Sequence, residues 1–232
     1  MKTELLKIQK KLSARFGPRN WWPAETDFEV CVGAILTQNT SWKNVEKAID
    51  NLKTENILSL EAIIDIEEEK LAAIIKPAGY YNLKAKRLKS LILYLSTVNS
   101  GDWRDFLVNS SLDEARASLL SVYGVGPETA DSILLYAANR KSFVIDKYTL
   151  RFCGRFGLLK EDTGYDEARA FFMSNLPKSY KLYNELHALL VVLGATYCKT
   201  KPDCIPCPLF GDCPTGKAMA KGTAKSSTKL KQ

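Results

Sequence analysis

Four cysteines gathered near the end of the chain constrain its fold more than any other feature. They fall in the segment CKTKPDCIPCPLFGDC, with five, two and five residues between them, at Cys198, Cys204, Cys207 and Cys213. Thiolates this close together on a proline-rich turn cannot all point into a hydrophobic core. Four soft ligands that converge on one point suit an iron–sulfur cluster or a structural zinc ion. The spacing leaves these two metal centres open, beside the alternative of two disulfides.

The beginning of the chain bears on the disulfide alternative. The sequence MKTELLKIQKKLSARFG is charged and amphipathic and has no apolar signal core. No apolar run approaches the roughly 20 residues needed to cross a membrane. We therefore expect a reducing, cytoplasmic compartment, where structural disulfides are rare and a metal centre is favoured. The other two cysteines, Cys31 and Cys153, stand in apolar contexts and are expected to be buried.

The net charge of +7 is unevenly distributed along the chain. Residues 216–232 hold five lysines and no acidic residue, so this tail accounts for five of the seven excess positive charges. The tail is poor in apolar residues, which predicts disorder. A loose lysine tail attracts phosphates without reading sequence. We interpret it either as a solvated terminus or as a non-specific tether to polyanions.

The hydrophobic pattern predicts an all-α fold. Apolar residues recur at i, i+3, i+4 and i+7, for example in the runs that begin at Phe28 and at Ala130. No segment alternates apolar and polar residues over the length of a strand. Glycines and prolines mark short turns between these runs. The pattern indicates about ten short helices with tight connections, followed by the cysteine loop and the tail.

One connection, in residues 119–137, has the composition of a phosphate site. The sequence LLSVYGVGPETADSILLYA runs from an apolar helix end through Gly124 and Gly126 into Pro127, which is favoured at the first position of a new helix. Two glycines around one aliphatic residue allow a tight turn with its backbone amides facing outwards. Those amides and the N-terminus of the next helix can hold a phosphate. A GxG alone is weak evidence, but the whole run with Thr129 is stronger.

This hairpin, an aspartate and the cysteine loop together resemble the endonuclease III superfamily of helix–hairpin–helix DNA glycosylases. The aspartate is Asp146 in FVIDKYTLRF, twenty residues beyond Gly126. The resemblance covers roughly residues 15–215. It implies a two-lobed fold, with a cluster domain of residues 1–22 and 136–215, a helical barrel of residues 23–135 that carries the hairpin, and the active site and DNA groove between them. It also implies a 4Fe–4S cluster on the four cysteines, with zinc as the alternative, and a nucleoid-associated monomer that binds damaged double-stranded DNA.

Within this resemblance, Asp146 is the expected catalytic residue, although a carboxylate after an apolar run is often only a helix N-cap. A fixed carboxylate stabilises the positive charge that develops on the sugar, or activates a water. Bifunctional family members carry a lysine where this chain has Glu128, and glutamate cannot form a Schiff base. Lys147 is a poor substitute, because successive helical residues point about 100° apart. We therefore expect base removal without strand cleavage.

The remaining site residues are expected to flip and recognise the base. Trp21, Trp22 and Trp42 are the candidates for an aromatic base pocket, although any single tryptophan could belong to the core. The resemblance places Gln38 in the duplex and Tyr80 as a wedge. Phosphate contacts are expected from the basic residues that follow Tyr80, namely Lys84, Lys86 and Arg87. Further DNA contacts are expected from the hairpin residues Gly124, Gly126 and Thr129.

These features resemble the bacterial 3-methyladenine DNA glycosylase III branch of the superfamily. Alkylated adenine carries delocalised positive charge, which electron-rich aromatic faces attract. His187, the sole histidine, lies in an apolar helical run and is interpreted as structural. The sequence thus predicts a monofunctional glycosylase for alkylated purines such as 3-methyladenine. The alternatives are a glycosylase for oxidised pyrimidines or mismatched bases, and a non-catalytic DNA-binding iron–sulfur protein.

Overall fold

The computed structural model describes residues 1–160 and 162–219, and every regular element within them is helical. This confirms the all-α class. Most of the lysine-rich tail, from residue 220 onward, lies outside the described residues. The chain divides into two compact units, which we name the terminal unit (Met1–Trp21 with the chain from Phe143 onward) and the central unit (Trp22–Ser142).

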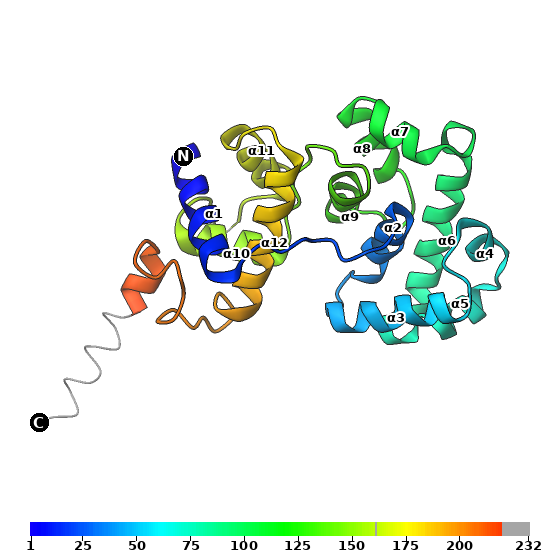
Figure 1. The fold of residues 1–232 in the computed structure, drawn as a ribbon, viewed down its shortest axis with the longest axis horizontal. Helices are drawn as coiled ribbons and strands as arrows, with labels where there is room; N and C mark the ends of the chain where they lie inside the picture. The colour runs from blue at the N-terminus through cyan, green and yellow to red at the C-terminus, as the bar shows by residue number, and fades with distance from the viewer. Residues whose placement is uncertain (161, 220–232) are drawn as a thin grey trace, which may run out of the picture. The chain divides into compact units, whose positions relative to one another are not determined.

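The central unit is built around α6 (Tyr81–Thr97), which contacts α2, α4, α5 and α7 (Figure 1). Its apolar face buries Ala85, Leu88 and Leu91 completely. The helices of this unit are α2 (Asp27–Leu36), α3 (Trp42–Thr54), α4 (Leu60–Asp65), α5 (Glu68–Ile74), α6, α7 (Trp103–Asn109), α8 (Leu112–Leu120) and α9 (Pro127–Ser132). Short 3₁₀ turns occupy Lys76–Ala78 and Val98–Gly101, and a π-helical turn, Ile133–Ala137, follows α9.

The terminal unit brings the two ends of the chain together. Its helices are α1 (Lys2–Phe16), α10 (Lys147–Phe156), α11 (Tyr165–Asn175) and α12 (Tyr180–Thr196). Both α1 and α10 pack against α12, and Figure 1 shows the first helix of the chain beside the last labelled one. A methyl group on Gly194 of α12 would lie 2.4 Å from the Tyr148 ring, so glycine permits the close approach of α10.

The boundaries of the two units differ from those that the sequence suggested. The division falls after residues 21 and 142, where the sequence indicated residues 22 and 135. Tyr136 and Ser142 account for the later second boundary, because both make contacts inside the central unit. The Tyr136 ring packs on Trp22, and the Ser142 hydroxyl donates to the buried carboxylate of Asp131.

Many of these helices have a polar residue at the N-cap position, where a side-chain oxygen accepts an unpaired backbone N–H of the first turn. Thr26, Ser59, Asp102, Ser111 and Ser179 each accept a backbone N–H from the first turn of the helix that follows. Cys31 and Cys153 are fully buried, as expected, and burial raises the pKa of Cys153 to about 12. Within the described part of the chain, no helix is both long and apolar enough to span a membrane.

Candidate active site and metal centre

The hairpin between α8 and α9 has the backbone geometry that its two glycines suggest. Gly124 has φ of 83°, and a Cβ atom there would lie 2.1 Å from the Cγ of Arg87. Glycine is therefore required twice over, by conformation and by space. Gly126 is the N-cap of α9, and no atom lies within 4 Å of where its Cβ would be. Space beside the second glycine is thus open, while Val125 between them is buried.

Gln38 and Arg87 fasten this hairpin to the rest of the central unit. The Gln38 Nε2 donates to the Gly124 carbonyl at 2.9 Å and to the Thr129 hydroxyl at 3.0 Å. Its Oε1 accepts from Arg87 at 2.6 Å. The side chain would have to give up three hydrogen bonds to enter a duplex. In this structure Gln38, Arg87 and Thr129 hold the hairpin in place.

Lys84 requires a correction to the phosphate contacts expected from the sequence. It is 1% exposed, and its ammonium donates to the carbonyls of Leu36 and Ala78 and to the Thr40 hydroxyl. Burial, with a smaller contribution from Arg87, lowers the pKa of Lys84 to about 8. Lys84 therefore caps the C-terminal end of α2, and its burial leaves it unavailable to a phosphate outside the protein.

The neighbouring residues of the same loop and helix are placed differently. Lys86 is exposed on α6. Tyr80 is 71% exposed and precedes α6 with a left-handed backbone, φ 46° and ψ 33°. A large exposed aromatic side chain held in that conformation is unusual, and such positions cluster at functional sites. Tyr80 and Lys86 thus remain open to an approaching ligand.

Asp146 is the N-cap of α10, which is the structural role that the sequence left open for it. Its Oδ1 accepts the Thr149 backbone N–H at 2.6 Å. The side chain is 12% exposed, and its Oδ2 lies 3.9 Å from the Nε2 of His187 on α12. Burial lowers the pKa of His187, and the Asp146 charge opposes this shift. Capping fixes one oxygen and orients the other, so it is compatible with catalysis.

Glu128 and Lys147, the two residues that bear on lyase chemistry, both lie at helix starts. Glu128 is exposed in the first turn of α9. Lys147 is exposed at the first residue of α10, next to Asp146.

Two of the three candidate tryptophans line one cavity in the central unit. Trp22 and Trp42 meet edge to face, with ring centroids 5.2 Å apart, and Tyr136 packs 5.3 Å from Trp22. A Cβ on Gly33 would lie 3.1 Å from the Trp22 ring, so glycine makes room for the indole. The cavity holds about 530 Å³, its open mouth included, and is lined by Trp22, Pro23, Glu29, Gly33, Trp42, Glu46, Ile49, Asp50 and Lys53.

Trp21 is not among the residues that line this cavity, and it belongs to the terminal unit. The acidic lining was not expected from the sequence. The available signal was the helical spacing of Trp42, Glu46, Ile49 and Lys53, which places them on one side of α3.

All four cysteines of the C-terminal segment line a single hollow in the terminal unit. It encloses about 410 Å³, its open mouth included, and its wall also contains Phe152, Arg155, Phe156, Leu193 and Tyr197. No disulfide joins any of the six cysteines. Burial raises the pKa of the Cys204 and Cys207 thiols. Among the described residues, no three His, Cys, Asp or Glu side chains are grouped to hold one metal ion.

Arg155, near the end of α10, ties the cysteine segment to that helix. Its guanidinium donates to the carbonyls of Lys199 and Thr200 and approaches the Cys198 sulfur at 3.5 Å. Arg151 donates to the Cys198 carbonyl at 2.7 Å. The helix that Asp146 caps is therefore anchored near its C-terminal end to the cysteine loop.

The chain matches the family described as HhH-GPD superfamily base excision DNA repair protein over residues 32–178. A Methanocaldococcus jannaschii protein with the provisional name DNA repair glycosylase is 50% identical to it over 90% of this chain and 95% of its own length. A crystal structure of Helicobacter pylori 3-methyladenine DNA glycosylase bound to 1,N6-ethenoadenine is 32% identical and superposes with a TM-score of 0.71 over 82% of this chain and 95% of its own. A non-covalent endonuclease III–DNA complex is 23% identical, with a TM-score of 0.81 over 95% of this chain and 99% of its own.

Proposed function

This chain belongs to the HhH-GPD superfamily of base excision DNA repair proteins, as a DNA glycosylase of the endonuclease III type, and we propose that its substrates are alkylated purines such as 3-methyladenine. The observation that carries the proposal is the cavity in which Trp22 and Trp42 meet. The likeness to the H. pylori 3-methyladenine DNA glycosylase supports it.

The chemistry of the substrate suits an aromatic cavity. Alkylation at a ring nitrogen gives a purine nucleotide a delocalised positive charge. A cation over a desolvated aromatic face gains about 0.5–2 kcal/mol from the ring quadrupole, and tryptophan is the strongest partner. An unmodified purine is neutral and does not gain this cation–π free energy. Trp22 and Trp42 therefore offer a way to distinguish alkylated from normal bases.

We assign Asp146 as the catalytic residue. Breaking the N-glycosidic bond develops positive charge on the deoxyribose, which a carboxylate stabilises directly or by activating a water to attack C1′. Burial lowers the pKa of His187, which favours a neutral imidazole beside Asp146 near pH 7. An alkylated purine leaves as a neutral base, so the reaction needs no strong general acid.

We further propose that the enzyme does not cleave the strand after removing the base. Lyase chemistry requires an amine that forms a Schiff base with the sugar. The position at which bifunctional relatives carry that lysine holds Glu128. Lys147 follows Asp146 directly, but it lies exposed at the first residue of α10, whereas Asp146 is the largely buried N-cap of that helix.

The four cysteines are proposed to bind a 4Fe–4S cluster. All four cysteines line one hollow, and thiolates are the ligands that hold iron–sulfur clusters in proteins. When bound, the cluster would crosslink the four cysteines of the C-terminal segment to one another. Arg151 and Arg155 would link that segment to α10, and so to the helix that Asp146 caps.

Double-stranded DNA is the proposed partner of a monomeric enzyme. The open backbone at Gly126, at the start of α9, is available to a phosphate, with Gly124 setting the turn. Tyr80 is the proposed wedge, and Lys86 a phosphate contact. Gln38, Arg87 and Thr129 support the hairpin from within the central unit.

Replacement of Trp42 tests the substrate assignment. Trp42→Leu should slow single-turnover excision of 3-methyladenine far more than it lowers the melting temperature, and Trp42→Phe should keep much of the activity because the π-face survives. Affinity for undamaged DNA should hardly change, since phosphate contacts carry it. A large loss of stability with normal excision per folded molecule would make Trp42 a core residue and would remove the support for an alkylbase pocket.

A further inference from the structure

We infer that Glu46 is a specificity residue of the Trp22–Trp42 cavity, holding the Trp42 indole and giving the cavity its preference for a cationic base. The inference rests on the proposed function, which assigns alkylated purines to this cavity. The inference goes beyond that function by assigning Glu46 two tasks: it orients the Trp42 ring and it attracts the charge of the ligand.

Helix α3 brings Glu46 and Trp42 together. Residues four apart on a helix share one face, and the Trp42 Nε1–H donates to the Glu46 Oε1 at 2.8 Å. The Trp22 and Trp42 rings meet at right angles, so Trp42 is held by an aromatic contact and, at its nitrogen, by a carboxylate. A hydrogen bond to an ionised acceptor is stronger than a neutral one. The carboxylate thus restricts the ring to one orientation.

The charges around the cavity leave Glu46 available to a cation. Lys53 is the basic residue of the lining, and it is already paired with Glu29 at 3.1 Å and with Glu25 at 2.8 Å. The hydrogen bond that the Lys53 ammonium donates to Glu25 is the largest cause of the raised pKa of Lys53, which stays charged between Glu25 and Glu29. Within the described chain, Glu46 forms no ion pair with a basic side chain.

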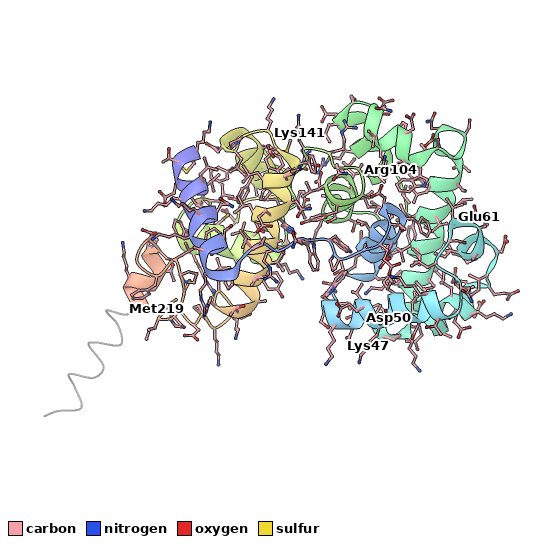
Figure 2. All side chains as sticks on the ribbon, in the orientation of Figure 1. Lys47, Asp50, Glu61, Arg104, Lys141 and Met219 are labelled. Atoms are coloured by element: carbon pink, nitrogen blue, oxygen red, sulfur yellow. The ribbon has the colours of Figure 1, made fainter. Side chains whose placement is uncertain are left out.

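Asp50, one turn further along the cavity wall, adds to the same negative potential and is labelled on α3 in Figure 2. A cationic ligand at the Trp42 ring would therefore meet two unneutralised carboxylates. A neutral base would gain nothing from them and would remove water from them, which costs free energy. The same groups attract one class of base and reject the other, as discrimination between close analogues requires.

Two ligands without a sugar test the inference directly. The 3,9-dimethyladeninium cation carries the charge of a 3-methyladenine nucleotide, and 9-methyladenine is its neutral counterpart. Binding of each to the intact protein is followed by quenching of tryptophan fluorescence. The variants are Glu46→Gln, which keeps an oxygen acceptor for the indole but loses the charge, and Glu46→Ala, which loses both. The matched control is Glu55→Gln, the same change at the end of α3 and away from the cavity lining.

We expect Glu46→Gln to weaken binding of the cation roughly three- to tenfold, the range of a partly exposed charge interaction, and to leave 9-methyladenine unchanged. Glu46→Ala should weaken the cation further and shift the tryptophan emission, because the indole loses its acceptor. Glu55→Gln should match the unchanged protein.

An unchanged ratio of the two affinities in Glu46→Gln would overturn the inference, as would equal loss of both ligands in parallel with stability. The proposed function fails on a different result, namely that the unchanged protein releases no methylated purine from DNA.

Discussion

The Nε2 of His187 lies 3.9 Å from the Oδ2 of Asp146, while the Oδ1 of the same carboxylate accepts the Thr149 amide at 2.6 Å. One oxygen of Asp146 thus caps α10, and the other faces a buried ring on α12. The two contacts define the rotamer of the residue that we assign to catalysis.

Asp146→Asn tests whether base release depends on the negative charge of Asp146 or only on its role as the N-cap of α10. Asparagine is as good an N-cap as aspartate, so α10 should keep its start and the melting temperature should change little. Base release should fall by roughly 10²–10⁴-fold, the cost of losing the main electrostatic stabiliser. Single-turnover release of 3-methyladenine, measured beside DNA affinity, checks this. Near-normal turnover would mean that Asp146 is a helix cap and nothing more.

The pH dependence of stability should report His187, because it is the sole histidine of the chain. Its pKa in the folded state lies below the ordinary 6.5 because it is buried. The unfolded chain therefore binds the proton more readily. The stabilisation is complete above pH 6.5 and is lost as pH falls toward the folded-state pKa, by up to about 1.4 kcal/mol per pH unit.

Urea unfolding between pH 7.5 and 5.5 measures this slope, with His187→Gln as the matched variant. The variant should show a flatter dependence than the unchanged protein over that range. Equal slopes in the two proteins would place His187 in contact with water, against its burial.

The hairpin glycines should separate folding from DNA binding. Gly124→Ala places a methyl group 2.1 Å from Arg87 Cγ at φ 83° and should cost about 1–3 kcal/mol of stability. Gly126→Ala meets open space at φ −94° and should leave the melting temperature nearly unchanged. It should weaken DNA binding, because the methyl group stands where a phosphate would approach. Similar affinities for Gly126→Ala and the unchanged protein would exclude a phosphate at this amide.

Site residues that belong to a local sequence motif can be predicted from the sequence, whereas contacts between residues far apart in the chain cannot. The hairpin, Asp146 and the cysteine segment can be predicted as site candidates, because each rests on a local run of residues. The sequence indicates only a structural role for His187, because its approach to Asp146 joins residues that no local pattern connects. The adjacent Trp21 and Trp22 could not be separated from sequence, although only the second lines the cavity.

The sequence does carry a signal for the burial of Lys84. It stands at helical spacing from Leu88 and Leu91, both fully buried, and next to Ala85 on the buried face of α6. Its basic character predicts a surface position, whereas its ammonium donates to the carbonyls of Leu36, at the end of α2, and of Ala78, in the 3₁₀ turn Lys76–Ala78. Gln38 was placed in the duplex by resemblance, and its hydrogen bonds to the hairpin follow only from the folded chain.

The metal content of the purified protein tests the cysteine assignment. We expect iron and sulfide in equal amounts and a brown colour, with Cys204→Ser losing both and unfolding at lower temperature, since thiolates are the natural ligands of such clusters. Cys31→Ser, at a buried cysteine outside the hollow, should keep its iron. One zinc per chain without sulfide would contradict the proposal.

Release of base from methylated duplex DNA is the most direct test of the account as a whole. The unchanged protein, in excess over DNA, is incubated with the duplex, and the free bases and the strand are analysed separately. We predict that 3-methyladenine is released while the strand stays intact until it is treated with alkali, and that borohydride traps no covalent complex. Release of oxidised or mismatched pyrimidines without any methylated purine, or a trapped Schiff base with a cut strand, would contradict the account.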